Sequence, residues 1–430
     1  MPEKPAEEKS FKPMNWKVLL AILTLSCVLM SSSYTMLIPF LPVYLTEELG
    51  VTEHVNMWSG AIFSITFLVS TVMAPIWGAM SDRGSRKLMA LRSSVLLALS
   101  YTLGGLVQTP FQLFLVRTLQ GVAAGLWAAL LAIMSSNCPQ QKLGISMGVM
   151  QGALTAGGVI GPLLGGLLAQ HFGMRWSFYA GGIALSLITV LLFVMVREEP
   201  RKPPAAVGKK AAAPVQKEKQ RSFFRNPQLR GLLVTAGLTQ ASVTLSMPIF
   251  SFYIAELQGS TENLVALSGF VFAILGIAGV IASPLWGWIG QRTSFGPVLL
   301  ISNLGAAVFA IVSALPPSLD PFIVLRFIGG LAFAGIFPAV NALLTRYTAS
   351  NERGRVYGVS FSVQQAGSIV GPLAGGAIAS FMTLQATMIA SGVVQLVAFA
   401  YLWLIRRDFT ADGGPSGEQG VEKHGVSGND

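Results

Sequence analysis

The sequence predicts an all-α membrane protein with twelve transmembrane helices in two pseudo-symmetric six-helix bundles. Three observations lead to this prediction: few charged residues, a series of long apolar runs, and motifs that recur about half a chain apart. Of the 430 residues, 52% are hydrophobic and only 11% are charged, whereas soluble domains carry about 25% charged residues. This deficit of charge is too large for a water-exposed surface and indicates a membrane.

The apolar runs are separated by short polar breaks, and about 20 apolar residues are enough to cross the hydrocarbon layer. The first half contains six such runs, at residues 16–45, 56–80, 88–109, 111–135, 144–169 and 175–196. The second half contains six more, at residues 229–255, 264–289, 297–315, 321–346, 356–381 and 384–405. The charged N-terminal segment lacks the apolar core of a signal peptide, so we expect the first run to be a retained span.

Basic residues indicate the orientation, because cytoplasmic loops of membrane proteins are enriched in Lys and Arg. With twelve spans the basic segments share one side, which carries Lys4, Lys9, Lys12, Lys17, Arg83, Arg86, Lys87, Arg92, Arg346, Arg353, Arg355, Arg406 and Arg407. The opposite loops carry Glu47, Glu48, Glu53, Glu256, Glu262 and Asp320. Both termini are therefore predicted to be cytoplasmic. The same pattern explains the net charge of +10 without a nucleic-acid partner.

The spans also predict the domain organisation. We expect a cytoplasmic tail at 1–15, a six-helix bundle at 16–196, a cytoplasmic linker at 197–228, a second bundle at 229–405 and a disordered cytoplasmic tail at 406–430. The linker is rich in Pro, Ala and Lys, and neither it nor the last segment shows apolar periodicity.

The two halves repeat each other. Three pairs share an offset of 209 residues, namely Pro39 with Pro248, Trp77 with Trp286, and Arg117 with Arg326. A fourth pair, Gly161 in GGVIGPLLGG and Gly371 in GSIVGPLAGG, is offset by 210. Duplicated helical halves predict a binding site between them near the midplane, with one half rocking against the other.

A charged loop motif, GAMSDRGSRK, follows the second span. It resembles the motif G-x-x-x-D-R-x-G-R-K of the major facilitator superfamily, with Ser85 where that family has Gly. The resemblance implies a conformational switch formed by Gly78, Asp82, Arg83, Arg86 and Lys87. The carboxylate of Asp82 can face the start of the eleventh span near Val356, where the helix dipole favours negative charge, and so hold the cytoplasmic side closed. The alternative is an ordinary basic loop.

The fourth span carries RTLQG at 117–121, which resembles the family's R-x-x-x-G signature. An arginine inside a span costs about 2.5–3.5 kcal/mol or more, so Arg117 is expected to face a polar cavity. The alternative is a side chain that snorkels to the nearby end of the span. Its repeat partner Arg326 lies closer to the end of its own span.

The fifth span carries GGVIGPLLGG, which resembles the antiporter motif G-x-x-x-G-P-x-x-G-G of drug:proton exporters. Glycines let helices approach closely, and a proline removes a backbone donor and bends the helix. The predicted pivot comprises Gly157, Gly161, Pro162, Gly165 and Gly166, with plain helix packing as the alternative. The segments NMWSG, FSITFL, WGAMSDR and RKLMALRS also resemble bacterial multidrug-resistance exporters of the drug:proton antiporter family.

By this resemblance, spans one, four, seven and ten line the substrate cavity, and transport proceeds by alternating access. Candidates for the substrate and proton pathway are Tyr34, Met36, Arg117, Gln120, Trp127, Gln240, Met247, Phe250, Phe333 and Asn341. Aromatic and Met side chains adapt to varied apolar ligands, although each can instead pack in the core or against lipid.

All 19 acidic residues lie in tails, loops or span ends. Proton coupling would then use a carboxylate at the outer mouth or Asp82, or export would not be proton-driven. We expect an exporter of small, largely apolar or amphipathic compounds that exchanges them for protons. A facilitator or symporter of a metabolite or organic anion is the first alternative, and a membrane sensor or enzyme is the second.

Catalysis is the least favoured function, because the chain has no His/Cys/Asp constellation for chemistry. We therefore expect no enzyme activity, no metal and no cofactor other than a proton gradient. The expected partners are a small-molecule substrate and the lipid bilayer, and the expected state is a monomer in the bacterial inner membrane.

Overall fold

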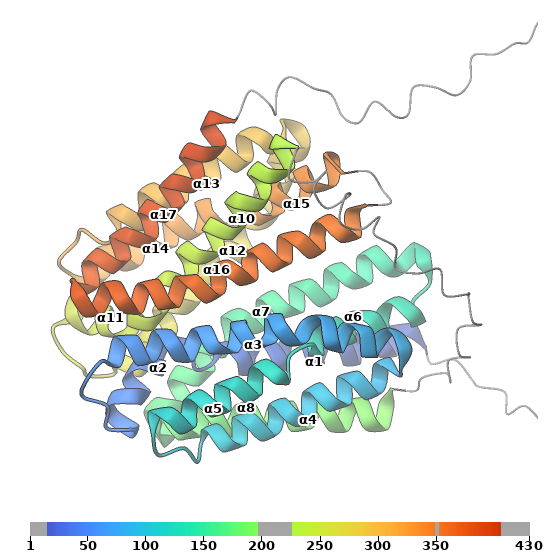
Figure 1. Ribbon diagram of the computed structural model, residues 1–430, viewed down its shortest axis with the longest axis horizontal. Coiled ribbons are helices and arrows are strands. Elements are labelled where there is room, and N and C mark those ends of the chain that lie inside the picture. Colours follow the sequence, from blue (N-terminus) through green and yellow to red (C-terminus); the bar gives the residue numbers. More distant parts are fainter. Residues whose placement is uncertain (1–14, 197–225, 349–351, 406–430) are drawn as a thin grey trace, which may run out of the picture.

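The computed structural model describes residues 15–196, 226–348 and 352–405, and these ranges are almost entirely helical (Figure 1). Ten of its helical segments are long and apolar enough to cross a membrane. Two more, α4 (Arg86–Gly104) and α16 (Arg353–Phe381), have 19 and 29 residues and correspond to the third and eleventh predicted spans. Each of the twelve predicted spans is thus helical. The predicted tails and most of the predicted linker lie outside the described residues.

In the first half, the opening span is α1 (Trp16–Thr35) followed by three short turns, η1 (Ile38–Phe40), α2 (Leu41–Val43) and η2 (Tyr44–Glu48). The following spans are α3 (Val55–Arg83), α4, the pair α5 (Pro110–Val122) and α6 (Leu126–Asn137), α7 (Gln140–Phe172) and α8 (Met174–Met195).

The second half repeats this order. Its first span is α10 (Pro227–Leu245), η3 (Met247–Ile249) and α11 (Phe250–Gln258), and α10 begins two residues before the predicted boundary because Pro227 occupies its first turn. Then come α12 (Leu264–Arg292), α13 (Phe295–Val312), the pair α14 (Leu319–Phe333) and α15 (Ile336–Arg346), α16, and α17 (Leu384–Leu404).

The fourth and tenth spans are both broken, and a tryptophan satisfies a backbone carbonyl at each break. The indole of Trp77 donates to the Val122 carbonyl at 2.9 Å, and that of Trp286 donates to the Leu331 carbonyl at 2.7 Å. Helix ends leave carbonyls without intrahelical partners, so these bonds stabilise the breaks. The offset of 209 residues between the two tryptophans thus corresponds to a shared structural role.

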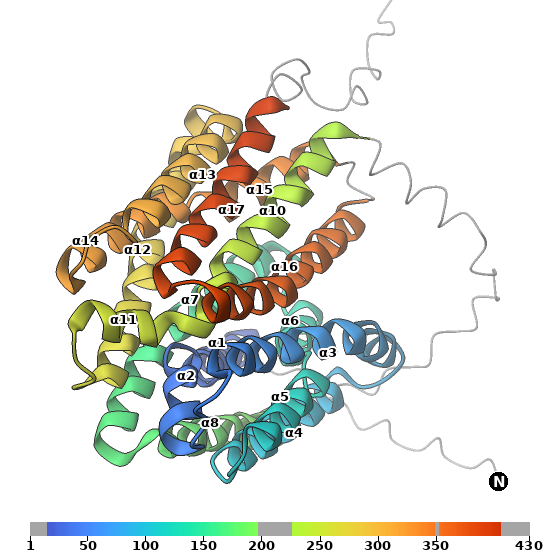
Figure 2. The same cartoon turned by 60° about the vertical axis from the view of Figure 1, so that its left-hand side comes forward.

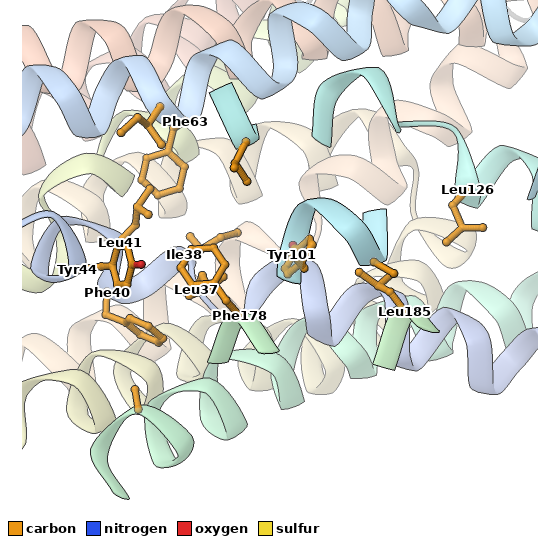
Figure 3. Packing of buried hydrophobic residues seen from close by; sticks show 14 of the residues in the cluster. Leu37, Ile38, Phe40, Leu41, Tyr44, Phe63, Tyr101, Leu126, Phe178 and Leu185 are labelled. Atoms are coloured by element: carbon orange, nitrogen blue, oxygen red, sulfur yellow. The ribbon is translucent and has the colours of Figure 1, made fainter. Parts of the chain in front are cut away.

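The two bundles lie one above the other in Figure 1, with α3 packed against α16 and α7 against α12. The larger buried core includes residues of both bundles, among them Phe40 and Tyr44 from the first and Phe250 and Tyr253 from the second. Figure 3 shows its first-half part, where the ring of Phe178 lies 5.1 Å from that of Tyr44. A second, smaller core is confined to the second half.

Candidate transport site

The bundles touch closely at one end of the molecule, which we call the closed end. It contains the starts of α3 and α12 and the ends of α7 and α16. A Cβ added to Gly60 or to Gly269 would collide with the backbone carbonyl of the proline in the facing helix, Pro372 or Pro162. Ser64 also donates to the Ile369 carbonyl at 2.7 Å. These two symmetric contacts bring the backbones together as only glycine allows.

The same helix pairs separate toward the opposite end, which we call the open end (Figure 2). The open-end halves of these four helices carry glycines for which an added Cβ would meet no atom within 4 Å, namely Gly78, Gly144, Gly148, Gly152, Gly279, Gly287, Gly354 and Gly358. The open end is the one with the basic loops. The space between the bundles is therefore open on the side that the sequence predicts to be cytoplasmic.

Arg117 lies inside the first bundle and does not snorkel, since only 3% of it is exposed. Its Nη1 donates to Oε1 of Gln120 at 3.2 Å, whereas its Nε and Nη2 are buried without a hydrogen-bond partner. The carbonyl of Arg117 accepts from the Thr66 hydroxyl at 3.1 Å, which ties α5 to α3.

Two tyrosines lie within electrostatic range of the Arg117 guanidinium, Tyr34 of α1 and Tyr101 of α4. The hydroxyl of Tyr101 is buried without a partner, and Tyr34 is half-buried. Arg117 makes no ion pair with a described carboxylate. The centre is thus a buried cation with unused donors, which suits a neutral or anionic group better than a cationic one.

The other predicted lining residues divide into two groups. Met36 is buried against Gly165 of α7, while Trp127, Gln240 and Met247 are half-buried and Asn341 is exposed. Phe250 and Phe333 instead belong to the surroundings of Arg326, since the Phe250 ring centroid lies 4.9 Å from that guanidinium and Phe333 lines the same pocket. The ten predicted residues therefore do not form one cluster.

The glycine motif of α7 serves two interfaces. Added Cβ atoms at Gly157, Gly161 and Gly165 would collide with α1, whereas Gly166 faces Ala266 of α12 across the closed end. The carbonyl of Pro162 lies against Gly269, also on α12. The predicted pivot thus joins α7 both to its own bundle and to the other one.

The charged loop motif is placed at the open end. The backbones of Asp82 and Arg83 end α3, and their side chains lie outside the described part of the structure. Ser85 caps α4 by accepting from the Leu88 amide at 2.9 Å, so a serine suits the position where the resembled motif has glycine. Within the first bundle, Arg86 donates to the Ala132 carbonyl, and Lys87 donates to the carbonyls of Phe193 and Val196 at the end of α8.

The described carboxylates all lie near helix ends or in loops. Glu48, at the end of η2, pairs with Arg175 at 2.8 Å, and Glu256 is exposed in the last turn of α11. Among the described residues, no group of His, Cys, Asp and Glu is arranged to hold a metal ion.

Two features of the site escaped the sequence analysis. Tyr101 lies on the third span, which was not among the spans expected to line the cavity, and nothing in its local sequence distinguishes it. The second feature is the pocket beside Arg326, where small residues leave space that only the repeat alignment could have indicated.

Comparisons with known proteins agree with this architecture. The family model of the Major Facilitator Superfamily matches residues 23–279 and 232–427. The multidrug resistance protein MdtG of Salmonella arizonae is 32% identical over 394 residues, covering 91% of this chain and 96% of that protein, and MdtG of Salmonella newport matches equally well.

Solved structures share the fold at low sequence identity. A bacterial homolog of the human lysosomal transporter Spinster, in an inward-facing and occupied conformation, superposes with a TM-score of 0.79 at 17% identity, covering 93% of this chain and 98% of that one. The nucleoside transporter NupG gives a TM-score of 0.72 at 16% identity, covering 91% of this chain and 100% of that one. The chain is therefore a multi-pass membrane protein and a transporter, not an enzyme, and it belongs to the Major Facilitator Superfamily.

Proposed function

We propose that the protein exports small, largely apolar or amphipathic compounds, drugs among them, across the bacterial inner membrane. The observation that carries this proposal is the 32% identity to a multidrug resistance protein over 91% of the chain. We propose a monomer with both termini in the cytoplasm. This orientation accounts for the basic open end, because cytoplasmic loops carry the excess of Lys and Arg.

Alternating access gives the closed and open ends their roles. Compounds enter between the bundles from the open end, and the bundles then rock against each other about the site between them until the glycine contacts of the closed end part. Asp82 would hold the open end shut in the other state by facing the start of α16. Helical N-termini favour a carboxylate, and the open space beside Gly78 and Gly354 fits a contact released in the present conformation.

We also propose that the protein exports its substrates in exchange for protons. The titrating group would be Asp82 or one of the carboxylates near the closed end, such as Glu47, Glu48 or Glu256, since the described carboxylates lie at helix ends. A facilitator or symporter of a metabolite or organic anion is the second candidate. The unpaired Arg117 favours it, because a buried cation without a carboxylate attracts anions.

The proposal is tested in a bacterium whose own exporters have been deleted. Accumulation of one cationic, one neutral and one anionic fluorescent amphiphile is measured with and without the protein. We expect lower accumulation of at least one compound, loss of the effect with Arg117→Ala, and retention with Arg230→Ala, an exposed arginine in the first turn of α10. Unchanged accumulation of all three, with the protein present in the membrane, contradicts export. Increased uptake of the anionic compound favours the facilitator.

A further inference from the structure

The second bundle contains a pocket of about 70 Å³. It lies among α10, α12, α13, α14 and α17, and its lining includes Arg326, Ser391 and Gln395. Gln395 is 2% exposed and donates to Oδ1 of Asn303 at 2.6 Å, while its own Oε1 is buried without a partner. The pocket is therefore polar on one side.

The internal repeat explains why the pocket exists. Arg326 corresponds to Arg117, but the three groups near Arg117 are each replaced by a smaller residue at the offset of 209. Tyr34 becomes Val243, Tyr101 becomes Ala310, and Gln120 becomes Gly329, and all three replacements line the pocket. The second bundle has thus kept the arginine and lost the side chains that surround it in the first bundle.

The charge of Arg326 is incompletely compensated. Its Nε is buried without a hydrogen-bond partner, and it makes no ion pair with a described carboxylate. Its guanidinium lies 4.9 Å from the ring centroid of Phe250 and 5.8 Å from that of Phe322. Such rings attract a cation within about 6 Å, but they leave its N–H donors unused.

We propose that this pocket binds a small monovalent anion of the chloride class. One guanidinium matches one negative charge, and Arg326 lines the same pocket as the smaller residues that replace Tyr34, Tyr101 and Gln120. The pocket of about 70 Å³ has room for a chloride ion together with water. Water alone would fill the space but leave the charge of the half-buried Arg326 unbalanced.

This inference goes beyond drug export, because the ion is a bound component of the second bundle and not the cargo. The pocket lies among five spans, and its lining includes Ser242 of α10, Phe309 of α13, Arg326 of α14 and Ser391 of α17. Ser242 and Ser391 already exchange hydrogen bonds at 2.8 and 2.9 Å across this wall. An anion there would hold the same spans together, and the stability of the protein reports its binding.

The test measures the melting temperature of the purified full-length protein by tryptophan fluorescence. Sodium chloride replaces sodium gluconate at constant ionic strength, and sodium bromide is then compared. We expect a saturable rise of about 2 °C with chloride and bromide, since a ligand that binds only the folded state stabilises it. Line broadening of ³⁵Cl in NMR, which requires no unfolding, gives an independent measure of binding.

Three variants make the result specific. Arg326→Gln removes the cation, and Val243→Tyr fills the pocket with the first-bundle residue while keeping the cation; both should abolish the chloride effect. Arg117→Gln, the matched change in the first bundle, should retain it. If Arg326→Gln fails to fold, Val243→Tyr and the ³⁵Cl line width still show whether chloride binds in the pocket. The proposal is overturned if wild type shows no chloride effect, if gluconate acts equally, or if the effect survives in Val243→Tyr.

Discussion

A single methyl group at Gly269 should shift the protein away from the present conformation. Gly269 lies on α12 at the closed end, and a Cβ there would be 3.2 Å from the carbonyl carbon of Pro162 and closer still to its oxygen. The obstacle is backbone, so no side-chain rotation can relieve it. The two helices must move apart, and parting of this end is the movement that alternating access requires.

The size of the effect follows from the cost of overpacking. Inserting one methyl group into a well-packed contact costs about 1–3 kcal/mol. The clash exists only while the closed end is shut. The added methyl group therefore destabilises only the present conformation, in which the open end is accessible. A differential cost of this size changes the ratio of the two conformations by about 5–150-fold.

The change is measured as a distance between spin labels at the closed end. The two native cysteines, Cys27 and Cys138, are both free and are replaced first. Labels at Phe172 of α7 and Ser260 before α12, both exposed, report the separation of the bundles. We expect Gly269→Ala to populate longer distances. Gly279→Ala on the same helix is the matched control, since its added Cβ meets nothing within 4 Å.

The reasoning is refuted if Gly269→Ala and Gly279→Ala give the same distance distribution as the parent protein. The closed end would then tolerate a methyl group, and its glycines would not control the separation of the bundles.

Three further predictions concern single contacts. Arg117→Lys should retain only part of the export activity in vesicles, because lysine keeps the charge but lacks the planar fork that reaches Gln120; full activity would show that charge alone suffices. Ser85→Ala should lower the unfolding free energy by about 0.5–2 kcal/mol, whereas Ser85→Gly should cost only a few tenths; equal thermal stabilities would contradict the capping role. Trp286→Phe should cost about 0.5–1.5 kcal/mol by removing its bond to the Leu331 carbonyl, and an unchanged melting temperature would argue against that bond.

The hydropathy pattern and the internal repeat predicted most of the fold. Twelve apolar runs predicted twelve helical spans, and the pairing of Trp77 with Trp286 correctly indicated two similar bundles, as their equivalent bonds to the broken spans confirm. Signals of this kind survive in a sequence because each span must be apolar regardless of its neighbours. The interruption of the fourth span at Gly125, where φ is +112°, was not predicted, since an isolated glycine in an apolar run has many uses.

The candidate site was harder to predict, because it depends on which side chains meet across helices. The sequence indicated Arg117 and Gln120 on one helix, three residues apart, and the structure joins them. It did not indicate Tyr101, which approaches from another span. The sequence also named Phe250 and Phe333 as pathway residues, and the structure places both beside Arg326 of the second bundle. The direction in which a helix faces is set by tertiary packing, and uniformly apolar spans show little of it in their pattern.

Transport in everted membrane vesicles tests the central claim most directly. A pH gradient, acid inside, is imposed, and uptake of the three fluorescent amphiphiles is followed for the wild type, Arg117→Ala and Asp82→Asn. The account predicts uptake that requires the gradient, collapses with a protonophore and is impaired in both variants. Uptake that is indifferent to the gradient would contradict proton-driven export and favour the facilitator.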